Sequence, residues 1–229
     1  MDTSHILYKA STWVLPILIA ITFHEAAHAY SAWKLGDDTA HRLGRVTFNP
    51  LKHVDPLGTI VVPALLLVSA APLLFGWAKP VPVAFNRLNR PRRDMALVAL
   101  AGPLTNVAIA LLSAILFHVV RFVPQPYALW LATTLYQSIL INLVLAVFNM
   151  IPIPPLDGSR VALSILPPLL ARPYVRLERF GFALLLGVIF LLPLVGRQLG
   201  MDLDPFRWLV QAPVRWMSPL FLNLAGLTT

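Results

Sequence analysis

Residues 12–33 read TWVLPILIAITFHEAAHAYSAW. This run is long and apolar enough for a helix that crosses a bilayer, yet its second half carries His24, Glu25 and His28. Ionisable residues are unfavourable inside a membrane span and by default mark a functional site there. Residues four apart lie on one face of a helix, so both imidazoles can reach one metal ion. The alternative is a pair of hydrogen-bonded histidines beside a neutral glutamic acid.

The composition also indicates a membrane protein. Hydrophobic residues make up 58% of the 229 residues and charged residues 12%, about half the charged fraction of soluble domains. The chain has no cysteine, which excludes disulfides and cysteine ligands to zinc. The net charge of +8 does not indicate a nucleic-acid partner, because the basic residues lie between apolar runs, where membrane topology accounts for them. We predict one membrane-embedded domain over residues 1–229, with a core at 12–160 and C-terminal helices at 161–229.

Apolar runs of about 20 residues are candidate spanning helices. They predict an all-α polytopic membrane protein with about five spanning helices, at residues 12–33, 95–120, 128–150, 179–195 and 206–227. The last of these runs contains Arg215 and two prolines, so it could lie along the membrane interface instead.

Two segments between the first and second spans are less regular. Residues 57–75 are apolar but are interrupted by two prolines. Residues 77–85 contain Pro80 and Pro82, and because proline is confined to sheet edges, we predict a short edge strand there.

The motif HEAAH at residues 24–28 is typical of zinc hydrolases, because Glu25 is placed to take a proton from zinc-activated water. A catalytic zinc site uses three protein ligands and keeps one position open. The helix itself offers no obvious third ligand. The remote candidates are His41, His53, Asp55 and Asp157.

Asp157 stands in the stretch NMIPIPPLDG at residues 149–158, directly after a predicted span. The prolines prevent a regular helix, and irregular backbone at membrane depth must be buried in protein or line a cavity. Asp157 is therefore a candidate for a site inside the membrane. The alternative is that it caps a helix that begins near Ser159.

Three motifs in this order resemble the site-2 protease family, the intramembrane zinc metalloproteases of the M50 type. They are HEAAH at 24–28, AGPLTN at 101–106 and the stretch from Asn149 to PPLDG at 154–158. Residues 49–58, which include His53 and Asp55, and residues 76–83 resemble a bacterial subgroup. No stretch resembles a PDZ or CBS domain, so we expect a minimal catalytic core.

This resemblance implies a Zn²⁺ ion held by His24, His28 and Asp157, with Glu25 as the general base. It also implies that Asn106 and Asn149 line the catalytic cavity, although Asn106 could equally make an interhelical hydrogen bond. For His53 and Asp55 we expect a loop or capping role. The implied activity is hydrolysis of peptide bonds within or near the transmembrane segments of membrane-protein substrates. We expect the strand at 77–85 to lie beside the zinc ion and to pair with the unwound substrate.

Membrane topology gives an independent criterion. His24 lies about 15 Å from the Lys34 end of its helix, and Asp157 must reach the same depth from the same side. This requires that the run 57–75 enters the membrane and returns, so we predict a re-entrant segment. Most basic residues then share one face: Lys34, Arg42, Arg45, Lys52, Lys79, Arg87, Arg90, Arg92, Arg93, Arg160, Arg172, Arg176 and Arg179. Because cytoplasmic loops collect Lys and Arg, we expect a multi-pass protein of the cell membrane whose active site opens toward the cytoplasm.

Two other classes of function remain possible from the residues alone. A zinc or proton transporter also places His and acidic residues in spans, but among the confident spans only the first carries an acidic residue, Glu25. A non-catalytic zinc scaffold needs a closed, four-ligand site, and no fourth ligand is evident. The protease is therefore the favoured prediction.

Overall fold

The computed structural model describes residues 3–62, 65 and 76–227, and the regular structure of these residues is helical, with no strand among them. The first half of the chain contains α1 (Thr3–Lys34), α2 (Thr39–Arg42), η1 (Pro50–Lys52), η2 (Pro56–Val61), η3 (Phe85–Arg87), α4 (Pro91–Leu116) and η4 (Phe117–Phe122). The second half contains α5 (Tyr127–Asn149), α6 (Asp157–Ile165), α7 (Pro168–Leu177), η5 (Glu178–Phe180), α8 (Gly181–Leu186), η6 (Gly187–Leu191), α9 (Leu192–Gln198), η7 (Arg207–Gln211) and α10 (Ala212–Leu224).

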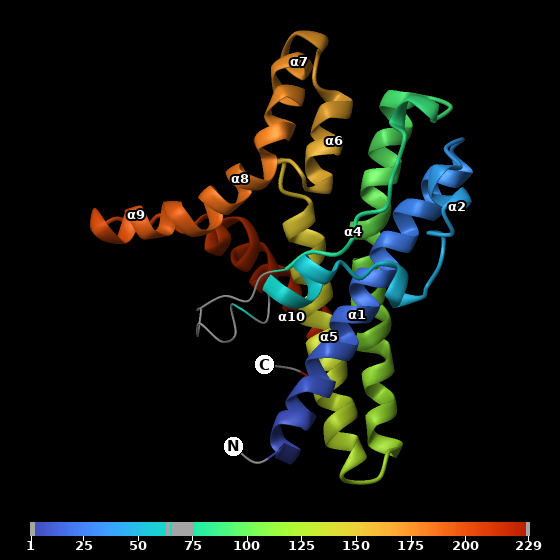
Figure 1. Ribbon diagram of the computed structural model, residues 1–229. Helices are drawn as coiled ribbons and strands as arrows, with labels where there is room; N and C mark the ends of the chain where they lie inside the picture. Colours follow the sequence, from blue (N-terminus) through green and yellow to red (C-terminus); the bar gives the residue numbers. More distant parts are fainter. Residues whose placement is uncertain (1–2, 63–64, 66–75, 228–229) are drawn as a thin grey trace.

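The helices α1, α4 and α5 run side by side as the central bundle (Figure 1). Small residues at their contacts are fully buried, among them Ala20 and Ala29 on α1 and Ala110 and Ala114 on α4. Small side chains allow membrane helices to approach closely, which increases van der Waals contact where no hydrophobic effect drives association. The helix α6 packs against α4 at the end of the bundle where α1 also ends.

Four described helices are long and apolar enough to cross a membrane: Ala10–Lys34, Pro91–Phe122, Tyr127–Asn149 and Pro168–Gln198. They cover the first four predicted spans except for Met150 at the end of the third, so the prediction of an all-helical multi-pass membrane protein is confirmed. The count of about five is not, because residues 206–227 do not form a candidate span. Arg207 and Arg215 lower the mean hydropathy of this segment, and Val210, Val214 and Phe221 pack it against the bundle formed by α4 and α5.

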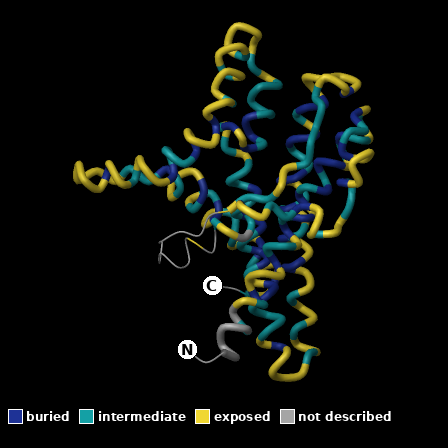
Figure 2. The backbone as a smooth tube through the Cα atoms, viewed as in Figure 1, coloured by how far each residue is buried: buried dark blue, intermediate teal, exposed yellow. Residues whose placement is uncertain are grey.

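The burial of residues along the backbone agrees with a membrane-spanning bundle (Figure 2). Buried residues concentrate where α1, α4, α5 and α6 meet, whereas the tips of α7 and α9 are exposed. Large apolar side chains such as Leu104, Leu112 and Ile115 point outward from α4. Exposed apolar residues on a long bundle are what contact with lipid requires.

The predicted re-entrant run lies largely outside the described residues, which exclude 63–64 and 66–75. Its two ends, however, are hydrogen bonded to each other. The Trp77 amide donates to the Gly58 carbonyl over 3.1 Å, and the Thr59 hydroxyl donates to the Trp77 carbonyl over 2.9 Å. A hydrocarbon core is about 30 Å thick, so residues 58–59 and Trp77, which are in direct contact, lie on the same side of such a core.

The predicted edge strand at 77–85 is wrong as secondary structure, since residues 76–84 form an irregular loop. Pro80 and Pro82 have no amide proton to give to a ladder. The amide of Lys79 donates to the His53 carbonyl, and that of Ala84 donates to the Asp37 carboxylate. These donors are satisfied by loops and by a side chain, so no neighbouring strand is needed.

Candidate metal centre and active-site cavity

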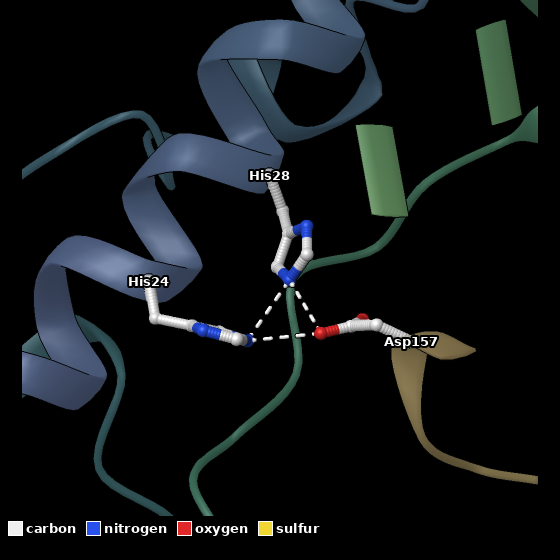
Figure 3. A group of neighbouring side chains, drawn as sticks. All are labelled: His24, His28 and Asp157. Atoms are coloured by element: carbon white, nitrogen blue, oxygen red, sulfur yellow. Dashed lines mark hydrogen bonds and ion pairs between the residues drawn. The ribbon is translucent and has the colours of Figure 1, made fainter. Parts of the chain in front are cut away.

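Three side chains from two distant parts of the chain converge on one point (Figure 3). His24 and His28 lie one turn apart on α1 and are both buried. Their Nε2 atoms are 3.0 Å apart, and Asp157 Oδ2 lies 3.2 Å from His24 Nε2 and 3.3 Å from His28 Nε2. Within the described residues, this is the group of His, Asp and Glu side chains that could hold a metal ion.

Asp157 reaches the histidines because the loop after α5 is tightly packed. A Cβ atom on Gly158 would lie 2.2 Å from the Met150 carbonyl oxygen, so only glycine allows α6 to begin this close to the end of α5. The N-cap residue of α6 is Leu156, and Asp157 lies one position later, in the first turn. Its carboxylate faces α1, which disfavours the capping alternative.

Hydrogen bonds fix where the imidazole protons are. His28 Nδ1 is 2.7 Å from the Val98 carbonyl oxygen, and His24 Nδ1 is 2.6 Å from Asn106 Oδ1. Both oxygens can only accept, so each Nδ1 carries a proton and each neutral ring has its lone pair on Nε2. Asp157 Oδ2 is buried and accepts no hydrogen bond within the described structure.

With both rings neutral, three electron-pair donors face one another, an arrangement that a bound cation stabilises. Zinc bound tetrahedrally to nitrogen and oxygen at about 2.0–2.1 Å holds neighbouring ligands about 3.3–3.4 Å apart. The observed separations of 3.0, 3.2 and 3.3 Å come close to that face of a tetrahedron. The donor set of two imidazoles and one carboxylate is that of a catalytic zinc site with one open position.

Room for such a metal ion is ensured by Gly102 on α4. A Cβ atom at this position would lie 2.4 Å from His28 Nε2 and 2.6 Å from His24 Cε1. The glycine therefore allows α4 to approach the Nε2 edges of both imidazoles without a side chain that would fill the space between them.

Glu25 borders a cavity of about 440 Å³ beside the metal centre. The cavity lies between α1, α5, the loop before α6, α8 and residues 76–80, and Asn149 is part of its wall. On one side the ring of Trp77 meets the ring of Phe182 edge-on, with centroids 5.1 Å apart. Glu25 Oε2 accepts a hydrogen bond of 2.9 Å from the Val81 amide, which fixes the carboxylate at the cavity wall.

Two polar side chains anchor residues 77–84 over this cavity. The buried guanidinium of Arg45 donates to the carbonyl oxygen of Lys79 over 2.8 Å. Asp37 accepts from the Ala84 amide. Burial opposes ionisation of Asp37, but hydrogen bonds from Thr39 and Ala84 hold the pKa of its carboxyl below the ordinary value. The predicted position of this segment, beside the metal centre, is therefore what the structure shows.

The other candidate residues lie elsewhere. His41 stacks on Trp33, and the buried His53 lies with Nε2 2.9 Å from the Thr47 carbonyl oxygen. The Asp55 carboxylate accepts from the amides that open η2. Asn106 is fully buried and contacts His24, and it is not among the residues that line the cavity.

Comparisons with known proteins agree with this site. Residues 125–194 match the family model described as peptidase family M50. YwhC of Bacillus subtilis (strain 168) is 40% identical over 185 residues, which are 79% of this chain and 80% of YwhC. Rip2 of Mycobacterium tuberculosis (strain H37Rv) is 31% identical over 195 residues, 84% of this chain and 72% of Rip2.

A third relative, MJ0611 of Methanocaldococcus jannaschii, is 48% identical over 64 residues, 28% of this chain and 31% of MJ0611. The names of all three describe them as candidate zinc metalloproteases. No solved structure matches the chain. The similarity to YwhC extends over most of both proteins, and the chain therefore belongs to peptidase family M50.

Proposed function

We propose that the chain is a zinc metalloprotease that hydrolyses peptide bonds within or near the transmembrane segments of other membrane proteins. The observation that carries the proposal is the meeting of His24 Nε2, His28 Nε2 and Asp157 Oδ2 next to Glu25. These three atoms would hold the zinc ion. When bound in an open site, zinc acidifies water and polarises a carbonyl group.

Glu25 has the role of the general base. Its carboxylate faces the cavity and is held by the Val81 amide through one oxygen, so the same group can accept a proton from the attacking water and pass it to the leaving amine. Asn149 lines the same cavity and anchors its amide on the Leu145 carbonyl. We assign to it the positioning of the scissile carbonyl.

The cavity indicates the class of substrate. Its walls include Ile21, Leu145, Phe148 and Leu185, which suit the side chains of a membrane span. A peptide bond inside a helix is shielded, so the substrate must unwind, and its freed amides and carbonyls need partners within the bilayer. The basic residues of the loops around α2 and α6 support a cytoplasmic position for this end of the bundle, and we infer that the cavity opens toward the cytoplasm.

The proposal is tested with purified protein in lipid vesicles that also contain a model single-span substrate. We expect cleavage within or beside the span, loss of cleavage when a chelator removes zinc, and recovery when Zn²⁺ is restored. Zinc flux across the vesicle without cleavage would indicate a transporter. Bound zinc with neither activity would indicate a scaffold.

We further propose that the unwound substrate lies along residues 77–81, of which Trp77, Ala78 and Pro80 line the cavity. Single cysteines at Ala78 and Pro80, in a chain that has none of its own, should crosslink efficiently to cysteines near the cleaved bond, because both residues line the cavity. A cysteine at the exposed Asn86 is the matched control, since it lies beyond the cavity on η3. Crosslinks that form at position 86 and not at 78 or 80 would contradict this path.

A further inference from the structure

A continuous chain of buried polar side chains leads away from the metal centre into the helix bundle. His24 Nδ1 on α1 is 2.6 Å from Asn106 Oδ1 on α4, and Asn106 Nδ2 is 2.8 Å from Asn142 Oδ1 on α5. Asn142 Nδ2 then donates to the Ser138 carbonyl over 2.8 Å. Both asparagines are fully buried. Buried amides in a membrane bundle are unfavourable unless paired, and here each one is paired on both ends.

Backbone carbonyls set the direction of this chain. A carbonyl oxygen can only accept, so the end of an amide that faces one must be the NH₂ group. Asn142 faces the Ser138 carbonyl, and Asn106 faces the Ala20 carbonyl over 3.2 Å. The oxygen of Asn142 therefore points to Asn106, and the oxygen of Asn106 points to His24. The orientation of each amide follows from a neighbour whose chemistry allows no alternative.

This direction determines the tautomer of His24. An oxygen opposite Nδ1 requires a proton on Nδ1 and leaves the lone pair on Nε2, where the metal ion would bind. If the Asn106 amide were reversed, its NH₂ group would face Nδ1, and the neutral ring would carry its proton on Nε2. His28 is not exposed to this risk, because its Nδ1 faces the Val98 backbone carbonyl.

We propose that Asn142 is a positioning residue of the metal centre, which acts through Asn106 to keep His24 Nε2 available to the metal ion. Asn142 accepts one of the two hydrogen bonds that the Asn106 NH₂ group donates, the other going to the Ala20 carbonyl. The inference rests on the proposed role of His24 as a zinc ligand. It adds that a residue without contact to the metal, on a third helix, sets the affinity of that ligand.

The test is metal affinity, measured by chelator competition for Zn²⁺ and by the electronic absorption spectrum of the Co²⁺-loaded protein. Hydrogen-bond partners behind a ligating histidine typically change metal affinity by about 10–100-fold. Because Asn142 acts on His24 only through Asn106, we expect Asn142→Leu to weaken zinc binding by about tenfold, at the lower end of this range. The same variant should change the Co²⁺ spectrum. Asn142→Asp should retain nearly normal affinity and the normal spectrum, since a carboxyl oxygen still accepts from Asn106.

Two reference variants separate the possible failures. Thr134→Val removes a buried hydroxyl of the same helix that bonds only the Trp130 carbonyl in the described structure, and it should leave the spectrum unchanged. His24→Ala should abolish tight binding.

If His24→Ala still binds zinc normally, the proposed function fails. If His24→Ala loses zinc as expected, but Asn142→Leu matches the wild type in affinity and spectrum, the positioning role is overturned. Asn142→Ala replaces the leucine variant if the latter does not fold, with the same expected tenfold loss.

Discussion

Replacing Glu25 with glutamine is expected to lower the rate of proteolysis by about 10²–10⁴-fold, the usual contribution of general acid–base catalysis, while zinc stays bound. Glutamine has nearly the same shape, and its amide oxygen can still accept from the Val81 amide at 2.9 Å. It cannot take up the proton of the attacking water. The zinc ligands are His24, His28 and Asp157 in our assignment, and none of them is altered.

The measurement compares initial cleavage rates in vesicles with the zinc content of the same preparation. Glu178→Gln is the matched control, because Glu178 at the start of η5 is paired with Arg160 on α6 and is not among the described residues that line the cavity. It should cleave at nearly the normal rate. Wild-type turnover by the Glu25 variant, with about one zinc per chain, would remove Glu25 from the mechanism.

The two histidines could be predicted from the sequence because their relation is local. A separation of four residues on a helix places them on one face whatever the rest of the fold. Asp157 is different, since its distance from His24 depends on every span between them. Local reasoning left four candidates, and the charge asymmetry of the loops together with the family motifs favoured Asp157. The hydrogen bond between Gly58 and Trp77 holds the two ends of the intervening run next to each other, as that choice requires.

The position of residues 77–85 could be predicted from the sequence, but their secondary structure could not. Prolines at positions 80 and 82 do indicate a chain without ladder partners on one side, and the segment lies beside the metal centre as predicted. Whether it forms a strand depends on a partner that no local pattern encodes. In the structure its donors are taken by His53, Asp37 and Glu25, and it remains an irregular loop.

Asn106 and Asn142 illustrate a second limit. A polar residue in an apolar span predicts a buried hydrogen bond, and on that ground Asn142 could have been noticed. Its partner, and hence its role, depends on the rotation of α5 against α4. The motif AGPLTN indicated Asn106 as functional, but only the packing shows that it meets His24 Nδ1 rather than the cavity.

Replacing Asp157 with alanine is expected to lower zinc affinity by more than the roughly 10–100-fold typical of partners behind a metal ligand, and to abolish cleavage with it. The Asp157 carboxylate supplies the only negative charge among the three donor groups. It is also the one donor of the three that does not come from α1. Without it, two imidazoles remain, one fewer ligand than a catalytic zinc site normally has.

The matched controls are His53→Ala and Asp55→Ala, which remove the other remote candidates in the loop before η2. His53 is buried beside Thr47, and Asp55 accepts from the Leu57 and Gly58 amides, so both variants should lose some loop stability and keep their zinc. Metal analysis of the three purified variants decides the matter. If zinc is retained in Asp157→Ala and lost in His53→Ala or Asp55→Ala, then the loop must supply the third ligand. The predicted topology, which requires Asp157 to lie at the same membrane depth as His24, would then lose its premise.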